Sequence, residues 1–535
     1  MFVKLISIRA VCFCCRRETV EMTNPLYEAL LEPHLESEKT FLLHDDGSKT
    51  SYCEFLELAS RLAHQLRELG IKPDDRIVVQ VSKRLETLAL YAASILTGTV
   101  YLPLNTSYTL NETEYFIKDA LPSFILCEDS LVKDLELFAT NIGAKILTLN
   151  NDGSGTLQND LDFFPNKFDV TARTSDSLAA LLYTSGTTGQ SKGAMLTQQN
   201  LLSNAKSLTK IWEITKHDIL IHALPIYHTH GLFVAINTSL LAGNSIRFMQ
   251  KFNVDLIIEA LPISTLLMGV PTFYTRLLSD LRFTKKTTKN MRLFISGSAP
   301  LLAETHNKFE QKTGHKILER YGMSETGMNS SNPYKGNRKA GTVGYPLPDI
   351  EIKITNLETA QELKQGEVGM IEVKGPNLFS GYWNMPEKTK EEFRANGFFI
   401  TGDLGMFDSE GYLHIIGREK DLIISGGENI YPKEVEDIIN QYDGVLESAV
   451  YGVTDPDLGE VVVSAIVMKP EYTLVESDLQ LFVKSKLVNY KNPKAYNLLK
   501  ELPRNTMGKV QKNILRKTQQ LFPNSSPSKG SMKPD

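Results

Sequence analysis

The sequence predicts an α/β protein with a large N-terminal domain of helix-covered sheets and a smaller α+β domain after it. Three observations lead to this prediction. The chain has 535 residues, more than one hydrophobic core usually organises. From Thr50 onward, helical periodicity alternates with short apolar runs, which is typical of parallel sheets covered by helices. Beyond Gly366, short strands and tight turns replace this alternation.

The alternation is clearest in the first half of the chain. SYCEFLELASRLAHQLRELG has helical periodicity and ends at Gly70, and the apolar run RIVVQVS then predicts a strand. A second helix is predicted from Leu85 to Leu96, before a strand from Val100 to Leu104. Further strands, each followed by a polar or glycine-bearing loop, are predicted at Ile219 to Leu224, Leu266 to Val270 and Arg292 to Ile295.

A smaller α+β unit is predicted after Ile430. Its elements are a helix from Pro432 to Gln441, strands from Glu447 to Val453 and from Val461 to Lys469, and a helix from Glu476 to Leu487. The tail from Asn524 is rich in Ser, Pro and Lys and is predicted to be disordered. The predicted organisation is an extension at 1–21, an N-terminal domain at 22–417, a hinge at 418–421, a C-terminal domain at 422–522 and a tail at 523–535.

Composition excludes several classes of protein. Apolar residues make up 42% and charged residues 23% of the chain, as in soluble globular proteins. The net charge of -5 lacks the positive excess that is typical of nucleic-acid-binding proteins. The best candidate for a membrane span, Leu256 to Val270, is interrupted by Glu259 and Pro262, so we expect no stable membrane insertion. Three of the five cysteines lie in the first 15 residues, which is no disulfide framework and fits a reducing compartment such as the cytoplasm.

The first 21 residues differ from the rest of the chain because they are apolar and basic. They allow two interpretations, a short targeting segment or an upstream start codon with Met22 as the natural first residue. The second is favoured because no clean small-residue cleavage site follows the apolar part. The cysteines of this segment, Cys12, Cys14 and Cys15, lack the second ligand pair that a metal site needs.

A phosphate-binding loop is predicted in LAALLYTSGTTGQSKGAMLTQQNL. A buried strand ends near Tyr183, and the glycines after it let backbone amides face an anion. The loop lacks the Gly-Lys-Ser/Thr ending of P-loop NTPases, and taken alone it is equally compatible with a surface linker. The candidate phosphate-binding residues are Thr184, Ser185, Gly186, Thr187, Thr188, Gly189 and Lys192, with Gly193 behind them.

Five motifs in order then resemble the adenylate-forming superfamily of acyl-CoA synthetases, luciferases and peptide-synthetase adenylation domains. They are TSGTTGQSKG, YGMSETG, FFITGDLG, YLHIIGREKDLIISGGENIYPKEVE and PRNTMGKVQK, and the resemblance extends from Met22 to about Phe522. It implies an N-terminal domain of helix-covered sheets plus a distorted barrel, a small mobile C-terminal lid, and an active site between them. It also implies ATP, Mg2+ and CoA as cofactors.

The resemblance assigns nucleotide contacts to residues whose chemistry suits them. Glu325 is an oxygen ligand for Mg2+, and Ser324 donates to a phosphate oxygen. Asp403 accepts from the ribose hydroxyls, Arg418 reaches ribose or phosphates as a rigid cation, and Tyr321 is a further ATP contact. The alternative for Asp403 and Arg418 is a solvated charged turn.

Residues of the lid are assigned in the same way. Lys509, after the slim Gly508, is implied to be the adenylation lysine, because an ammonium stabilises the charge that develops at the α-phosphate. Lys420 matches the hinge position of the superfamily. Gly426 and Gly427 fall where relatives admit the pantetheine arm of CoA, and a tight β-turn is the alternative, compatible reading.

The acid is predicted from a narrower resemblance. ALPIYHTHGLF, LLMGVPTFYTRLL, RLFISGSAPLL and YGMSETGMNSSNPY resemble the malonyl-CoA synthetases more than fatty-acyl or aryl-CoA ligases. In this resemblance Arg276 binds a second carboxylate, with His228 and His230 as further donors. The alternative is an Arg276 that extends to solvent from an ordinary amphipathic helix.

We therefore expect an acid-thiol ligase that forms malonyl-CoA through a malonyl-adenylate, releasing AMP and pyrophosphate. Another acyl-CoA synthetase of the superfamily, such as a medium- or long-chain one, is the main alternative. A carrier-protein loader, a luciferase-like oxygenase and a silent binding protein are weaker alternatives. The choice between malonate and methylmalonate, and the oligomeric state, stay open.

Overall fold

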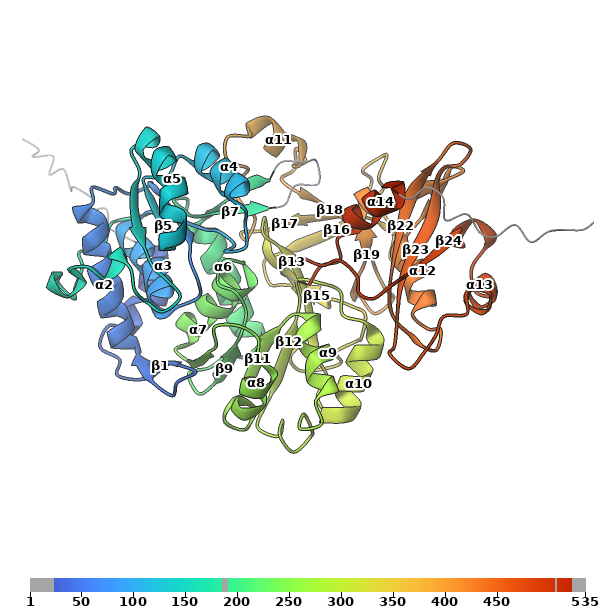
Figure 1. Ribbon diagram of the computed structural model, residues 1–535, viewed down its shortest axis with the longest axis horizontal. Helices are drawn as coiled ribbons and strands as arrows, with labels where there is room; N and C mark the ends of the chain where they lie inside the picture. The colour runs from blue at the N-terminus through green and yellow to red at the C-terminus, as the bar shows by residue number, and fades with distance from the viewer. Residues whose placement is uncertain (1–23, 185–190, 506–507, 522–535) are drawn as a thin grey trace, which may run out of the picture.

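The computed structural model describes residues 24–184, 191–505 and 508–521. A large body built from the first three quarters of the chain lies beside a smaller C-terminal domain, drawn in orange and red (Figure 1). The predicted extension at 1–21 and the tail at 523–535 lie outside the described residues. No helix in the described part of the chain is long and apolar enough to cross a membrane.

The first sheet has six strands in the order β6-β5-β3-β4-β7-β8 and is parallel apart from the β7–β8 pair. It confirms the parallel alternation predicted from the sequence. The β7–β8 hairpin carries the predicted phosphate loop at its tip. The strands are β3 Arg76–Gln80, β4 Val100–Pro103, β5 Phe124–Cys127, β6 Lys145–Thr148, β7 Leu178–Thr184 and β8 Lys192–Thr197.

The second sheet has nine strands in the order β15-β14-β13-β12-β11-β9-β10-β1-β2, and its central strands, from β13 through to β1, are parallel. The carboxyl ends of parallel strands meet at one edge, where ligands of open α/β sheets bind. The strands are β1 Thr40–Leu43, β2 Lys49–Ser51, β9 Ile219–His222, β10 Ser245–Phe248, β11 Leu266–Gly269, β12 Leu293–Ser296, β13 Leu318–Met323, β14 Gly327–Ser331 and β15 Tyr345–Pro346.

Two antiparallel arrangements complete the fold. The region expected to be a distorted barrel is a four-stranded antiparallel sheet of β16 Glu351–Thr355, β17 Gly369–Lys374, β18 Phe399–Phe407 and β19 Leu413–Arg418. The C-terminal sheet comprises β20 Ile423–Ser425, β21 Glu428–Ile430, β22 Val445–Asp455, β23 Gly459–Met468 and β24 Ala495–Leu499, with β24 parallel to β23.

Helix ends follow local sequence signals. At the start of α2 the Ser51 hydroxyl accepts from the Glu54 N–H, and the Glu54 carboxylate accepts from the Ser51 N–H, which is a capping box. Gly98 ends α3 in the left-handed conformation. The α-helices are α1 Pro25–Leu30, α2 Tyr52–Glu68, α3 Leu85–Thr97, α4 Leu110–Ala120, α5 Asp129–Ile142, α6 Gln198–Ile211, α7 Asn237–Ala242, α8 Val254–Ala260, α9 Pro271–Ser279, α10 Ala303–Thr313, α11 Pro386–Glu391, α12 Pro432–Ile439, α13 Glu476–Lys484 and α14 Lys512–Leu521.

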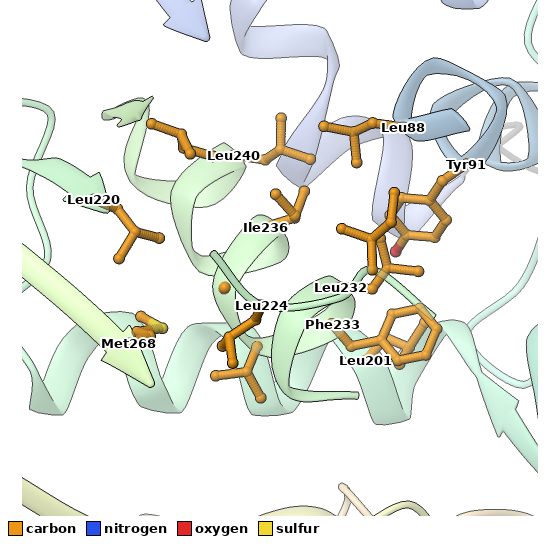
Figure 2. Packing of buried hydrophobic residues seen from close by; sticks show 14 of the residues in the cluster. Leu88, Tyr91, Leu201, Leu220, Leu224, Leu232, Phe233, Ile236, Leu240 and Met268 are labelled. Atoms are coloured by element: carbon orange, nitrogen blue, oxygen red, sulfur yellow. The ribbon is translucent and has the colours of Figure 1, made fainter. Parts of the chain in front are cut away.

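A π-helix at His230–Ile236 runs into α7 through the middle of the main hydrophobic core. Figure 2 shows Leu232, Phe233 and Ile236 of this π-helix among side chains from α3, α6, β9 and β11. π-helical turns are rare and frequent at functional sites. The predicted loop with His228 and His230 therefore leads directly into buried structure.

Candidate active site

Three strands bring together a tyrosine, an aspartate and an arginine. Asp403 of β18 lies opposite Arg418 of β19, whose Nε forms an ion pair with Asp403 Oδ1 at 2.8 Å. The hydroxyl of Tyr321, on β13, donates to Asp403 Oδ2 at 2.6 Å. The charge of Asp403 raises the pKa of Arg418. Both oxygens of Asp403 are thus oriented by the protein, and each keeps a second lone pair for a ligand.

A second group lies where β13 ends and β8 begins. Lys192 Nζ donates to Glu392 Oε1 at 2.8 Å and lies 4.2 Å from the centre of the Tyr382 ring. The Tyr382 hydroxyl is 2.7 Å from Glu392 Oε2 and 3.2 Å from Glu325 Oε1, so one hydroxyl links the two carboxylates. Burial raises the pKa of Glu325. Neither Tyr382 nor Glu392 was identified from the sequence, where both lie in the unremarkable segment between two motifs.

Lys509 reaches this region from the C-terminal domain. Asn505 holds it: the Lys509 N–H donates to Asn505 Oδ1 at 3.0 Å, and the Asn505 N–H donates to the Lys509 carbonyl at 2.9 Å. Gly508 has φ 75°, and a Cβ there would lie 3.5 Å from Thr272 Cγ2 at the start of α9. Lys509 is solvent-accessible, yet the surrounding protein and the charge of Arg418 lower its pKa. The C-terminal domain therefore places one ammonium against the N-terminal domain.

The two predicted histidines lie together in a buried polar cluster. Burial and the charge of Lys509 lower the pKa of His228 to about 4, and burial lowers that of His230 well below its ordinary value. The Nδ1 of His230 is 3.3 Å from Ser298 Oγ, and Ser298 has φ 70°. Positive φ in a residue other than glycine is costly and clusters at functional sites.

Arg320 completes this cluster and was missed by the sequence analysis. Its side chain is buried, and a Cβ on Gly297 would lie 2.4 Å from its Cζ. Among the described residues, Arg320 Nε and Nη2 and the Nε2 atoms of His228 and His230 have no hydrogen-bond partner. Burial lowers the pKa of Arg320 to about 9. Unpaired buried donors are costly, so this cluster is suited to an anion that would pair them.

Arg276 lies outside this cluster. It is exposed on α9, one turn beyond Thr272, and its Cζ is 5.6 Å from the centre of the Phe252 ring. No carboxylate of the described residues forms an ion pair with it. The structure therefore does not bring Arg276 against the histidines, but it leaves the guanidinium free beside the helix end that contacts Gly508.

The remaining predicted residues divide into three groups. Ser324 lines a small cavity with Tyr227, His228 and Thr229, which places the nucleotide motif next to His228. Thr184 Oγ1 lies 3.5 Å from the Lys192 carbonyl oxygen at the described edge of the loop. The predicted phosphate contacts Ser185, Gly186, Thr187, Thr188 and Gly189 lie outside the described residues.

The hinge and the glycine pair lie at the junction of the two domains. Lys420 is in a short 3-10 turn, Glu419–Asp421, which separates β19 from β20. Gly426 and Gly427 have φ 59° and 86° and form the two-residue turn between β20 and β21. This exposed hairpin is the tight β-turn that the sequence allowed.

Both domains match families of known proteins. Residues 33–383 match the AMP-binding enzyme family, and residues 434–509 match the C-terminal domain of AMP-binding enzymes. The chain belongs to this family. The predicted superfamily and the two-domain α/β fold are thereby confirmed.

Individual relatives show which kinds of CoA ligase the chain is similar to. The chain is 36% identical to a malonate–CoA ligase of Arabidopsis thaliana, over 88% of this chain and 85% of the relative. It is 33% identical to a long-chain-fatty-acid–CoA ligase of Bacillus subtilis, over 87% of this chain and 89% of the relative.

Among solved structures, ATP-bound MatB from Rhodopseudomonas palustris has a TM-score of 0.91 and 51% identity, covering 93% of this chain and 98% of that chain. The apo form of MatB, at the same identity and covering 93% and 99%, has a TM-score of 0.82. The arrangement seen here is therefore more similar to the ATP-bound form.

Proposed function

We propose that this AMP-binding enzyme is a malonate:CoA ligase, which forms malonyl-CoA from malonate, ATP and CoA and releases AMP and pyrophosphate. The observation that carries the proposal is the cluster of unpaired buried nitrogens of Arg320, His228 and His230, in which the Arg320 nitrogens are donors and each histidine Nε2 can donate in one tautomer. A hydrocarbon chain would leave these donors unpaired, whereas a short dicarboxylate would accept from them. The likeness to malonate–CoA ligase and to MatB supports the same acid.

In the first half-reaction, a malonate oxygen attacks the α-phosphorus of ATP, and the bond to pyrophosphate breaks. Lys509 neutralises the charge that develops at the α-phosphate. Asp403, Tyr321 and Arg418 bind the ribose side of the nucleotide, and Lys192 and Ser324 the phosphates. The predicted phosphate contacts of Thr184 to Gly189 complete this set. The higher TM-score with ATP-bound MatB supports this as the adenylation arrangement.

Glu325 fits the role of a magnesium ligand. It is one buried carboxylate without a neighbouring cluster of three potential ligands in the described chain, and Mg2+ is commonly held by one or two carboxylates together with substrate phosphates. When bound, the ion would neutralise phosphate charge. Burial raises the pKa of Glu325, and a bound cation would oppose this rise because it favours the charged carboxylate.

In the second half-reaction, the CoA thiol attacks the malonyl carbonyl and AMP leaves. Lys509 has to withdraw for the thiol to approach, and we assign the backbone change to residues 418–421 around Lys420. The exposed turn at Gly426 and Gly427 would then border the path of the pantetheine arm. A reducing compartment such as the cytoplasm would suit the free thiols of Cys53 and Cys127.

The test is pyrophosphate release with ATP, Mg2+ and CoA and with malonate, methylmalonate, succinate, acetate or octanoate, the acyl-CoA being identified by mass spectrometry. Malonyl-CoA as the main product is expected. Octanoyl-CoA as the main product would support the adenylate-forming reaction but contradict malonate as the acid, in line with the long-chain relative.

Arginine variants then identify the cation that binds the second carboxylate. Loss of charge-assisted hydrogen bonds in Arg276→Ala or Arg320→Met should raise the KM for malonate about 10- to 100-fold, with the KM for ATP unchanged. Arg282→Ala is the matched control, because Arg282 is an exposed arginine paired with Asp255 and Asp280. Equal effects on malonate and ATP would remove that arginine from the acid site.

A further inference from the structure

Lys83 is a buried lysine that the reaction described above does not use. It follows β3, and only 7% of it is exposed. Its Nζ lies 2.5 Å from His222 Nδ1, 2.8 Å from the His222 carbonyl oxygen and 3.1 Å from the Leu224 carbonyl oxygen. These three acceptors match the three N–H groups of an ammonium.

His222, the last residue of β9, continues the chain of hydrogen bonds. Its side chain is fully buried, and its Nε2 lies 2.7 Å from the Gly231 carbonyl oxygen. Because a carbonyl oxygen only accepts, Nε2 carries a proton, and Nδ1 is left to accept from Lys83. Lys83 and His222 therefore form one hydrogen-bonded chain, in which the ammonium donates to the imidazole and the imidazole donates to the Gly231 carbonyl.

This unit ties both ends of the segment 223–231, which we call the histidine loop because it contains His228 and His230. Lys83 binds the carbonyl of Leu224 near the start of the loop, and His222 binds the carbonyl of Gly231 at its end. The two ends are in close contact, since a Cβ on Gly231 would lie 1.9 Å from the Pro225 carbonyl oxygen. The orientation of the loop thus depends on this pair.

The other side of the loop is held by packing. The loop ends in the π-helix, whose Leu232, Phe233 and Ile236 lie in the hydrophobic core (Figure 2). Packing secures the helix, but it is non-directional, whereas the hydrogen bonds from Lys83 and His222 fix the direction of the carbonyls. The loop is therefore anchored by both kinds of interaction.

Burying this lysine is costly. Among the described residues no carboxylate forms an ion pair with Lys83, and burial lowers the pKa of this lysine well below its ordinary value, a cost that an aliphatic side chain of similar size would avoid. A contribution to stability alone is therefore a weak explanation for a lysine at this place. The direct hydrogen bonds to the histidine loop offer a functional explanation.

We propose that Lys83 and His222 are positioning residues for the acid, which hold the histidine loop so that His228 and His230 face the substrate carboxylate. The inference rests on the proposed function only in taking the histidine loop as part of the acid site. It holds for whichever acid the enzyme uses, because it concerns how the loop is fixed and not which carboxylate it binds.

The experiment compares four variants of the full chain: Lys83→Met, His222→Leu, His222→Gln and Lys39→Met. Lys39 is the matched control, since it also donates to two main-chain carbonyls, those of Lys216 and Gly243, but away from the histidine loop. Each variant is measured for kcat, for KM of the acid that wild type uses best, for KM of ATP and for its melting temperature.

The KM for the acid should rise at least tenfold in Lys83→Met and His222→Leu, while the KM for ATP changes less than twofold. His222→Gln should stay within about threefold of wild type, because a glutamine amide supplies one acceptor for Lys83 and one donor for Gly231. Lys39→Met should lower the melting temperature without changing either KM.

A parallel change in both KM values, or no change in either, would overturn the proposal and leave a structural role. Equal loss in His222→Gln and His222→Leu would overturn it as well, and this pair decides the matter if Lys83→Met does not fold. If wild type prefers an acid other than malonate, the proposed substrate fails, but the same KM comparison with that acid still tests Lys83 and His222.

Discussion

The two sides of the active site are built in opposite ways. On the N-terminal side, Asp403 and Glu325 are buried, each accepts a hydrogen bond from a tyrosine hydroxyl, and Asp403 also pairs with Arg418. On the C-terminal side, Lys509 is hydrogen-bonded to Asn505, and it remains accessible to solvent. The difference supports a division in which the N-terminal domain provides fixed binding groups and the C-terminal domain a charge that can be withdrawn.

Lys509→Ala should have the largest effect, because it removes the charge from the C-terminal side. We expect the rate of adenylation to fall about 10²- to 10³-fold, since loss of one donor to a developing oxyanion has that magnitude. ATP binding should persist, and conversion of supplied malonyl-adenylate to malonyl-CoA should stay near the wild-type rate. Pyrophosphate release, ATP titration and the second half-reaction measure the three quantities.

Lys500→Ala is the control, since Lys500 is an exposed lysine of the same domain. If Lys509→Ala lost both half-reactions equally, the charge would not belong to the first step alone, and the contrast between the two sides would fail.

Asp403→Asn comes next, because it alters a fixed group. The KM for ATP should rise about 10- to 100-fold through loss of charge-assisted hydrogen bonds, and Tyr321→Phe should have a smaller effect of the same kind. Steady-state kinetics with varied ATP provide the measurement. Asp408→Asn, which breaks pairs with Lys339 and His414 in the same sheet, should change stability and leave the KM for ATP unaltered.

Glu392→Gln tests whether the N-terminal side is preorganised. Hydrogen bonds from Lys192 and Tyr382 outweigh burial and keep the pKa of Glu392 below its ordinary value, so this carboxylate is charged and orients Lys192. If that orientation helps to bind phosphates, the variant should raise the KM for ATP about threefold to tenfold. Tighter ATP binding would instead mean that Glu392 competes with the nucleotide for Lys192.

The smallest effect concerns pH. Because burial and Lys509 lower the pKa of His228 to about 4, the unfolded chain, with a histidine pKa of about 6.5, binds more protons between these values. The stability that neutral His228 contributes is therefore lost as pH falls from about 6.5 to about 4. His228→Asn should make the free energy of unfolding less dependent on pH, by up to about 1.4 kcal/mol per pH unit.

Urea unfolding at pH 7 and pH 5 measures this dependence, with His217→Asn as the control at an exposed histidine. An unchanged difference between the two pH values would show that His228 titrates as in the unfolded chain. The same measurement on the double variant with Lys509→Ala would then show how much of the pH dependence of stability comes from the charge of Lys509 in the C-terminal domain.

Prediction from the sequence succeeded where function depends on a contiguous motif. The order of the motifs led to the family and to the two-domain α/β fold, and periodicity located elements such as α2 and α12 within two residues of their ends. It did not find Arg320, although this residue directly precedes Tyr321, the first residue of the YGMSETG motif. Charge at one position does not reveal whether the side chain is buried or paired.

Residues whose partners are distant in the chain could not be predicted from the sequence for the same reason. Glu392 meets Lys192 across 200 positions and Lys83 meets His222 across 139, and neither pair has a signature in the local sequence. Arg276 illustrates the opposite case, since the pattern selected it as an acid contact and the structure shows it exposed on α9 near Phe252, with its role still a prediction.

The sequence by itself determined the family of this protein, because its ordered motifs depend on residue types at short spacings; the phosphate loop, the magnesium carboxylate and the adenylation lysine that these motifs imply stay predictions. Only the tertiary structure decided which of its charges are buried, paired or free. Burial and pairing arise when strands such as β9, β13 and β18 come together, and they set the cost of each unpaired donor around Arg320 and the hydrogen bonds that hold the histidine loop.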